Sequence, residues 1–342
     1  MFHRILVPLD GSQRAEQALP VAARLARASG GSLILARIVQ TGTALLWAPT
    51  ALDPVTMHSW LESATEAAEA YLQHVAALPI LHDVPTEKIV RSGLPADQLL
   101  RLGPEVGADL LVLCSHGYRG LQRWALGSVA LRLIRHALIP VLVLRAHGEM
   151  LAGPQPGYER PFRAVVPLDG SVRAKAALEP AAALIHALAA PAPAALHLLA
   201  VVEADEEEPA DEAAQHERER RLARARRYLA TTVEQIRAGL VAPQVAGLQL
   251  ELTWSVHTGS DVAQTILDVA EQGQDLADTP LSRGCDLLAM STHGREGLQR
   301  WLLGSVTERV LARTRLPLLI VRPQGIEEAP RTPWGTLQDD LD

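Results

Sequence analysis

Short, uninterrupted apolar runs alternate along this chain with longer stretches in which alanine and leucine recur among polar residues. In the first half, the apolar runs predict buried strands at residues 5–9, 32–39, 88–91, 110–114 and 141–145. The stretches between them predict helices at residues 13–28 and 60–77, and two further helices that begin at Pro95 and at Gly127-Ser128. Continuous apolar strands that alternate with helices indicate a parallel sheet covered on both faces.

The same order of elements occurs a second time. RILVPLDGSQRA, from Arg4, recurs as RAVVPLDGSVRA from Arg163, and HGYRGLQRWALGSV, from His116, recurs as HGREGLQRWLLGSV from His293. The second set of strands is predicted at residues 164–168, 196–202, 251–256, 287–290 and 318–321, with a strongly charged helix at 216–237. A long, ordered repeat predicts an α/β protein of two tandem doubly wound domains, each with five parallel strands.

Length agrees with this duplication. The chain has 342 residues, and a typical domain has about 150. The turn-forming pairs Gly153-Pro154 and Pro156-Gly157 predict a linker. We therefore place the first domain at residues 1–147, the linker at 148–160, the second domain at 161–323, and a flexible, polar C-terminal tail at 324–342.

Charge and cysteine content narrow the class of protein. A net charge of −7 argues against a general nucleic-acid binder, because phosphates attract a basic surface. The longest apolar run, residues 137–144, is too short for the roughly 20 residues that span a bilayer. Two cysteines form neither a disulfide framework nor a zinc pattern, and no secretory signal is visible. The sequence thus predicts a cytoplasmic protein without nucleic-acid or membrane partners.

The first candidate binding loop follows the first strand of each repeat. It contains Pro8, Asp10, Gly11 and Ser12 in the first copy, and Pro167, Asp169, Gly170 and Ser171 in the second. Ligands of an open parallel sheet bind beyond the carboxyl ends of its strands, where the strand order switches. The aspartates are candidates for binding a ribose hydroxyl, or a divalent ion such as Mg²⁺ carried with phosphates. Alone, such a turn is more often only a helix cap.

The second candidate loop follows the fourth strand of each repeat. It comprises Ser115, His116, Gly117, Gly127, Ser128 and Val129 in the first copy, and Ser291, Thr292, His293, Gly294, Gly304, Ser305 and Val306 in the second. Glycines let the backbone approach an anion, and the free N–H groups at a helix start favour phosphate. Each motif has an alternative explanation as ordinary framework, but their combination at fixed spacing, twice, favours a binding site.

At these residues the sequence resembles the universal stress protein family. Nucleotide-binding members of that family carry Gly, two residues, Gly, nine residues, Gly and then Ser or Thr; the last three positions match Gly117, Gly127 and Ser128, and Gly294, Gly304 and Ser305. The resemblance implies a Rossmann-like fold of the adenine-nucleotide alpha-hydrolase-like type, with ATP or another adenine nucleotide bound. It also assigns Ile38 and Val201 to the adenine contact.

The resemblance further implies that the domains pair through their last strands as a pseudo-dimer within the chain, and it leaves a further homodimer open. Its functional implication is a stress-response sensor or regulator with at most slow ATP hydrolysis. Two rivals stay open: a nucleotide-independent dimerisation or interaction module, and a hydrolase or nucleotidyl transferase. The hydrolase or transferase is the weakest of the three hypotheses, because no catalytic acid–base pair can be named.

The sequence departs from the family pattern at its first glycine. That position holds Cys114 in the first copy and Ser291 in the second. A side chain there is predicted to crowd the ribose, and the thiol is bulkier than the hydroxyl. We therefore expect unequal sites, with nucleotide bound more readily by the second copy.

Overall fold

The computed structural model describes residues 1–40, 54–115, 127–145, 161–204, 212–273, 284–292 and 303–323. The chain separates into two compact units, residues 1–147 and residues 148–342. The predicted linker at 148–160 and the predicted tail at 324–342 lie outside the described residues. Within the described part, no helix combines the length and apolar character needed to cross a membrane.

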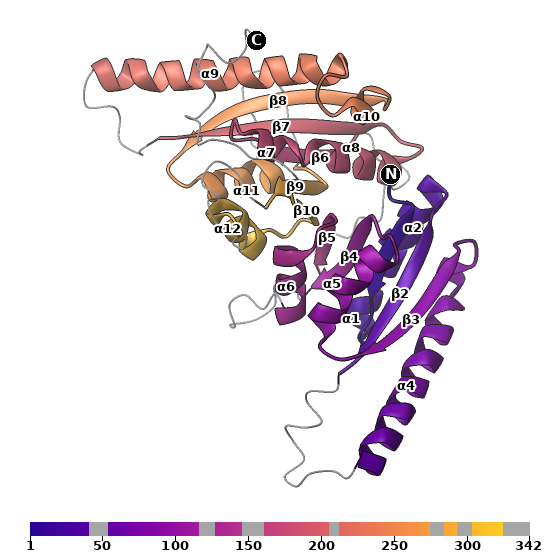
Figure 1. The fold of residues 1–342 in the computed structure, drawn as a ribbon. Helices are drawn as coiled ribbons and strands as arrows, with labels where there is room; N and C mark the ends of the chain where they lie inside the picture. The colour runs from indigo at the N-terminus through magenta and orange to yellow at the C-terminus, as the bar shows by residue number, and fades with distance from the viewer. Residues whose placement is uncertain are drawn as a thin grey trace. The chain divides into compact units, whose positions relative to one another are not determined.

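The first unit alternates strands and helices along the chain (Figure 1). Its elements are β1 (Arg4–Pro8), α1 (Gln13–Glu16), α2 (Leu19–Ser29), β2 (Ser32–Val39), α4 (Pro54–Ala76), the 3₁₀ turn η1 (Pro79–Leu81), β3 (Thr86–Ser92), α5 (Pro95–Glu105), β4 (Leu110–Ser115), α6 (Ser128–His136) and β5 (Val141–Arg145). The strands lie in the order β3-β2-β1-β4-β5, and the described pairs are parallel.

The second unit repeats this architecture. Its elements are β6 (Phe162–Pro167), α7 (Val172–Lys175), α8 (Leu178–Ala189), β7 (Ala194–Glu203), α9 (Glu212–Arg237), α10 (Pro243–Ala246), β8 (Leu250–Gly259), α11 (Val262–Gln272), β9 (Leu287–Ser291), α12 (Ser305–Arg313) and β10 (Leu318–Val321). The strand order is β8-β7-β6-β9-β10, again with parallel pairs. The prediction of two tandem doubly wound α/β domains is confirmed.

Apolar side chains of the central strands form the core of each unit. Ile5, Leu6 and Val7 of β1 are fully buried, as are Val165 and Val166 of β6. In the first unit, α4 packs along β2 and β3, while α5 packs against the same two strands and against α6. Because β-α-β crossovers are right-handed, α2 and α4 cover one face of the sheet and α5 and α6 the other.

The predicted single helix at residues 13–28 is wrong in one respect. The structure breaks it into α1 and α2 between Glu16 and Leu19. The N–H of Gln17 and that of Ala18 bond to carbonyls three residues back, so the chain tightens into a turn. Pro20, which has no N–H to donate, is then accommodated in the first turn of α2. The second unit repeats the break between α7 and α8.

The long helices also extend beyond their predicted starts. The helix predicted at 60–77 is α4, which begins at Pro54, and the charged helix predicted at 216–237 is α9, which begins at Glu212. Figure 1 shows α4 running beside β3 and α9 beside β8. Each long helix therefore covers the outer part of its own sheet.

Candidate functional site

The first candidate loop is a capped turn at the carboxyl end of β1. The Oδ1 atom of Asp10 accepts hydrogen bonds from the N–H of Ser12 at 2.9 Å and from its hydroxyl at 2.5 Å. The Ser12 oxygen in turn accepts from the N–H of Ala15 at 3.2 Å, which caps α1. Gly11, between them, adopts a left-handed φ of +83°, which favours glycine.

The second unit builds the same turn after β6. Asp169 Oδ1 accepts from the Ser171 N–H at 3.0 Å and from its hydroxyl at 2.7 Å. The Ser171 oxygen accepts from Ala174 N–H at 3.1 Å, and Gly170 has a φ of +88°. The motif therefore has a structural role in both units, and one carboxylate oxygen of each aspartate is engaged within the turn.

The balance of forces on Asp10 keeps its carboxylate ionised. Partial burial acts to raise its pKa, but the hydrogen bonds from Ser12 and the charge of Arg14 outweigh that effect. The net pKa lies below the ordinary value. Asp10 is exposed at the sheet edge, so it is suited to accept a hydrogen bond from a ligand hydroxyl.

Removing the cap is expected to weaken the fold modestly. Ser171→Ala deletes the acceptor for Ala174 N–H and one donor to Asp169, so the free energy of unfolding should fall by about 1 kcal/mol. Urea unfolding followed by circular dichroism measures this change. The matched control is Ser128→Ala, whose side chain is exposed and follows the N-cap Gly127; equal losses in the two variants would contradict the assignment.

Strand order places the two candidate loops at neighbouring strand ends. In the first unit, β1 lies between β2 and β4, and the chain changes direction across the sheet at this point. In the second unit, β6 lies between β7 and β9 in the same way. Because all these strands are parallel, their carboxyl ends share one edge, which is the position where doubly wound sheets bind ligands.

Both predicted phosphate-binding helix starts are present. Gly127 caps α6 and Gly304 caps α12, with nearly identical backbone angles (φ −55°, ψ 146° and φ −59°, ψ 144°). Ser128 and Ser305 are the first helical residues and are exposed. The N–H groups of a helix's first turn have no partner within the helix, so both starts offer donors to an anion.

The structure ties the second loop to the sheet at both of its ends. Gly304 N–H donates to the carbonyl of Thr292 at 2.8 Å, and Thr292 N–H donates to Val321 at 2.9 Å. The Thr307 hydroxyl donates to the carbonyl of Ser291 at 3.0 Å, which links α12 to β9. Ser291 and Thr292 are buried, and their backbone groups join β9 to α12 and β10; their contact with a ligand stays a prediction.

Four predicted site residues of the second candidate loops lie outside the described residues: His116, Gly117, His293 and Gly294. In the first unit, Ser115 is the last residue of β4 and is buried; its hydroxyl contacts the Leu144 carbonyl at 3.3 Å.

The two residues that stand in place of the family's first glycine lie at strand ends. Cys114 lies on β4, with its sulfur 3.6 Å from the side-chain oxygen of Gln17. Burial raises the pKa of this thiol to about 11, despite the charges of Arg14 and Arg145, so it is protonated at neutral pH. Ser291, its counterpart, ends β9.

The predicted adenine contacts occupy equivalent positions. Pro8 of β1 pairs with Ala36 and Pro167 of β6 pairs with Leu199. Ile38 and Val201 each lie two residues further along their strand, at its carboxyl end. Their predicted place on the second strand of each unit is confirmed, and their contact with adenine stays a prediction.

Arg37, next to Ile38 on β2, was not predicted as a site residue. Its guanidinium lies over Gly11, so a Cβ at that glycine would collide with it. Arg37 also stacks on the Tyr71 ring of α4 at 4.6 Å, and the Tyr71 hydroxyl donates to Glu16 at 2.9 Å. The equivalent of Arg37 in the second unit is the buried Ala200. At this position the first unit therefore carries a guanidinium group and the second a methyl group.

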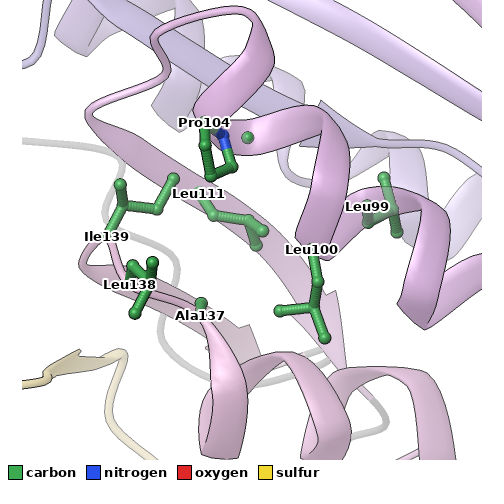
Figure 2. A pocket seen from close by; sticks show the side chains of 8 residues that line it. Leu99, Leu100, Pro104, Leu111, Ala137, Leu138 and Ile139 are labelled. Carbon is green, nitrogen blue, oxygen red and sulfur yellow. The ribbon is translucent and has the colours of Figure 1, made fainter.

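A small apolar cavity lies elsewhere in the first unit (Figure 2). It is lined by Leu99, Leu100, Gly103, Pro104, Leu111, Ala137, Leu138 and Ile139. At about 10 Å³ it has room for one water molecule at most. Leu111 is near the amino end of β4, so the cavity is at the opposite end of the strands from the candidate loops.

Comparison with known proteins agrees with the duplicated architecture. The model of the universal stress protein family matches residues 1–145 and, separately, residues 162–322. The chain belongs to the universal stress protein family. Two successive matches confirm a tandem member of that family, with one family domain in each unit.

Individual universal stress proteins match one unit at a time. The chain is 28% identical over 148 residues to universal stress protein YxiE of Bacillus subtilis, which covers 42% of this chain and 100% of that relative. It is 30% identical over 146 residues to a universal stress protein of Thermus aquaticus, again covering 42% and 100%. These relatives are therefore the length of one domain.

A solved universal stress protein extends over both units. The crystal structure of such a protein from Archaeoglobus fulgidus has a TM-score of 0.61, covering 94% of this chain and 99% of that one, with 17% sequence identity. At this identity the likeness concerns the fold.

Proposed function

We propose that this universal stress protein binds ATP or another adenine nucleotide and acts as a stress-response sensor or regulator. The observation that carries the proposal is that both units have the same two motifs at the carboxyl edge of the sheet. In each unit, an Asp-Gly-Ser turn and a Gly-Ser helix start follow neighbouring strands at a switch in strand order. Ribose hydroxyls suit the aspartates, and phosphates suit the helix N–H groups.

Mg²⁺ would enter such a site with the nucleotide. Within the described residues, no group of three or more His, Cys, Asp or Glu side chains converges on one point. Asp10 or Asp169 would therefore contribute a single carboxylate, with the phosphates and water completing the coordination, which is a common arrangement for Mg²⁺. The ion would neutralise phosphate charge; the residues of this chain would orient the ligand.

The proposal includes regulation and no more than slow hydrolysis. Ser12 and Ser171 are committed to capping, since each side-chain oxygen accepts from the N–H three residues further along. The chain would work in the cytoplasm, a reducing compartment that suits cysteines outside disulfides, as Cys114 and Cys285 are. The units would pair through β5 and β10, so that neither apolar edge strand is left open; a further homodimer would build on this pair.

Nucleotide extraction tests the proposal. Purified protein is denatured and the supernatant is resolved by anion exchange. We expect adenine nucleotide in the supernatant, and added ATP to raise the melting temperature, because a ligand bound only by the native state stabilises it. Absence of both effects would favour the nucleotide-independent interaction module, whereas multiple-turnover ATP hydrolysis well above background would favour an enzyme.

A further inference from the structure

A chain of hydrogen bonds runs through the sheet of the second unit. His197 of β7 contacts the Thr253 hydroxyl through Nδ1 and the Ser255 hydroxyl through Nε2, both at 2.8 Å. The Ser255 hydroxyl also contacts Nε2 of His257 at 3.1 Å. The chain therefore leads from the middle of β7 to the carboxyl end of β8.

The inner end of this chain is neutral. His197 is fully buried, and burial lowers its pKa to about 3, assisted by the nearby charges of Arg163 and His257. Burial also lowers the pKa of His257. A neutral imidazole donates through one nitrogen and accepts through the other, so these contacts form a relay in which each bond sets the direction of the next.

Strand register places the outer end beside the proposed base contact. Val201 of β7 pairs with His257 of β8, and residues paired in parallel register share a face of the sheet. Strand order then follows the proposed ligand: phosphates at the helix start after β9, ribose at the turn after β6, base at the end of β7. Since β8 is the next strand, His257 lies at the base end of this row.

The contact with Ser255 also orients the ring. Ser255 is two residues before His257, toward the amino end of β8, and it engages Nε2. The two nitrogens of an imidazole point in nearly opposite directions. With Nε2 engaged by Ser255, Nδ1 is the ring nitrogen of His257 that would bond a ligand at the carboxyl edge of the sheet.

The first unit carries different chemistry at the same positions. Ile38 pairs in register with Arg91, the counterpart of His257, and Arg91 forms an ion pair with Glu105. Ile34, the counterpart of His197, is apolar and fully buried. The relay is therefore a property of the second unit, and the first unit replaces it with a paired guanidinium.

We infer that His257 is a further binding residue of the second unit, and that its Nδ1 hydrogen-bonds the edge of the nucleobase. This inference rests on the proposed nucleotide-binding function and identifies the group that contacts the base. Ser255 and His197 are positioning residues, because they hold the His257 ring and set its tautomer without touching ligand.

The relay would let His257 either donate a hydrogen bond to an acceptor atom of the base or accept one from a donor group. If Ser255 donates to Nε2 of His257, then Nδ1 carries the proton and donates to a ring nitrogen of the base. If Nε2 donates to Ser255, then Nδ1 accepts from an amino group. Because Ser255 has a single hydroxyl proton, the choice reverses the His197 contacts as well, so ligand binding fixes the direction of the whole relay.

Binding measured with two ligands tests the inference in the full chain. Gly127→Val serves as the parent, so that the second unit is observed alone. We expect His257→Leu to weaken ATP binding about tenfold, the loss of one net hydrogen bond, and to leave binding of inorganic tripolyphosphate unchanged. His257→Gln, whose amide keeps a donor and an acceptor, should recover part of the loss.

A direct measurement complements the variants. The ¹⁵N resonances of the His257 ring in the parent should shift with ATP and stay unchanged with tripolyphosphate. Unchanged ring resonances with ATP bound, or equal affinity of parent and His257→Leu for ATP, would overturn the inference while leaving nucleotide binding intact. Equal weakening of both ligands would also overturn it, since it would mean general damage to the site. A parent that binds no ATP would instead refute the proposed function of the second unit, and this inference with it.

Discussion

Gly304→Val is expected to remove adenine nucleotide from the second unit while leaving the fold intact. Gly304 caps α12 at φ −59° and ψ 144°, a conformation that valine adopts without strain. Its N–H and carbonyl bonds, to Thr292 and from Glu308, would persist. The added side chain, however, would occupy the approach to the N–H groups of Ser305 and Val306, where the proposed phosphate binds.

The expected loss of affinity is large. Hydrogen bonds to a charged group contribute about 1.5–3 kcal/mol each, so excluding phosphate from two N–H groups should weaken binding about a hundredfold or more. Nucleotide released on denaturation measures the effect, and the melting temperature without ligand reports on the fold.

Gly127→Val is the matched control for this prediction. Its backbone angles are nearly the same, and a Cβ there would meet no atom within 4 Å. It should remove only the nucleotide of the first unit, and the double variant should release none. Undiminished release from Gly304→Val would refute the placement of phosphate at the start of α12.

Acid is expected to destabilise the second unit through His197. Its pKa is about 3 in the folded protein and about 6.5 in an unfolded chain. The unfolded state therefore binds the proton more tightly. The stability contributed by neutral His197 is complete above pH 6.5 and is lost as the pH falls from 6.5 toward 3. Between pH 7 and pH 4.5 this loss amounts to about 2–3 kcal/mol.

His197→Gln isolates this effect from the carboxylates that titrate in the same range. Glutamine does not titrate, and its amide can still bond the hydroxyls of Thr253 and Ser255. Urea unfolding at pH 7 and at pH 4.5 gives the free energy of unfolding for both proteins. The variant should lose about 2–3 kcal/mol less than the wild type. Parallel pH profiles would contradict a neutral, buried His197.

Local sequence signals account for most of the secondary structure. Short apolar runs predicted the inner strands to within a few residues because a buried strand needs apolar side chains on both faces; the outer strands β3 and β8 are only partly buried. The break before α2 was missed although Pro20 marks it. The early start of α4 at Pro54 was missed as well, although proline is favoured in the first turn of a helix.

In the candidate site, too, the local motifs were predicted and the contacts between strands were not. The Asp-Gly-Ser turn and the Gly-Ser helix start are local motifs, and the structure has the turn after β1 and β6 and the helix start at α6 and α12. Strand order makes the preceding strands neighbours, β1 beside β4 and β6 beside β9, as the repeat and the α/β pattern indicated. The polar alternation of Thr253, Ser255 and His257 was a visible signal of one polar sheet face, although the sequence alone gave it no partner.

The sequence by itself thus determined the duplication, because the same motifs recur in the same order. It also determined the strands and both candidate motifs, because these depend on neighbours a few positions apart. Packing alone brought Arg37 over Gly11 and joined His197 to Ser255, 58 positions away. Such contacts depend on which strands pair and in which register, and a shift by one residue would turn every side chain to the other face. The tertiary structure therefore decided how the two otherwise similar binding edges differ.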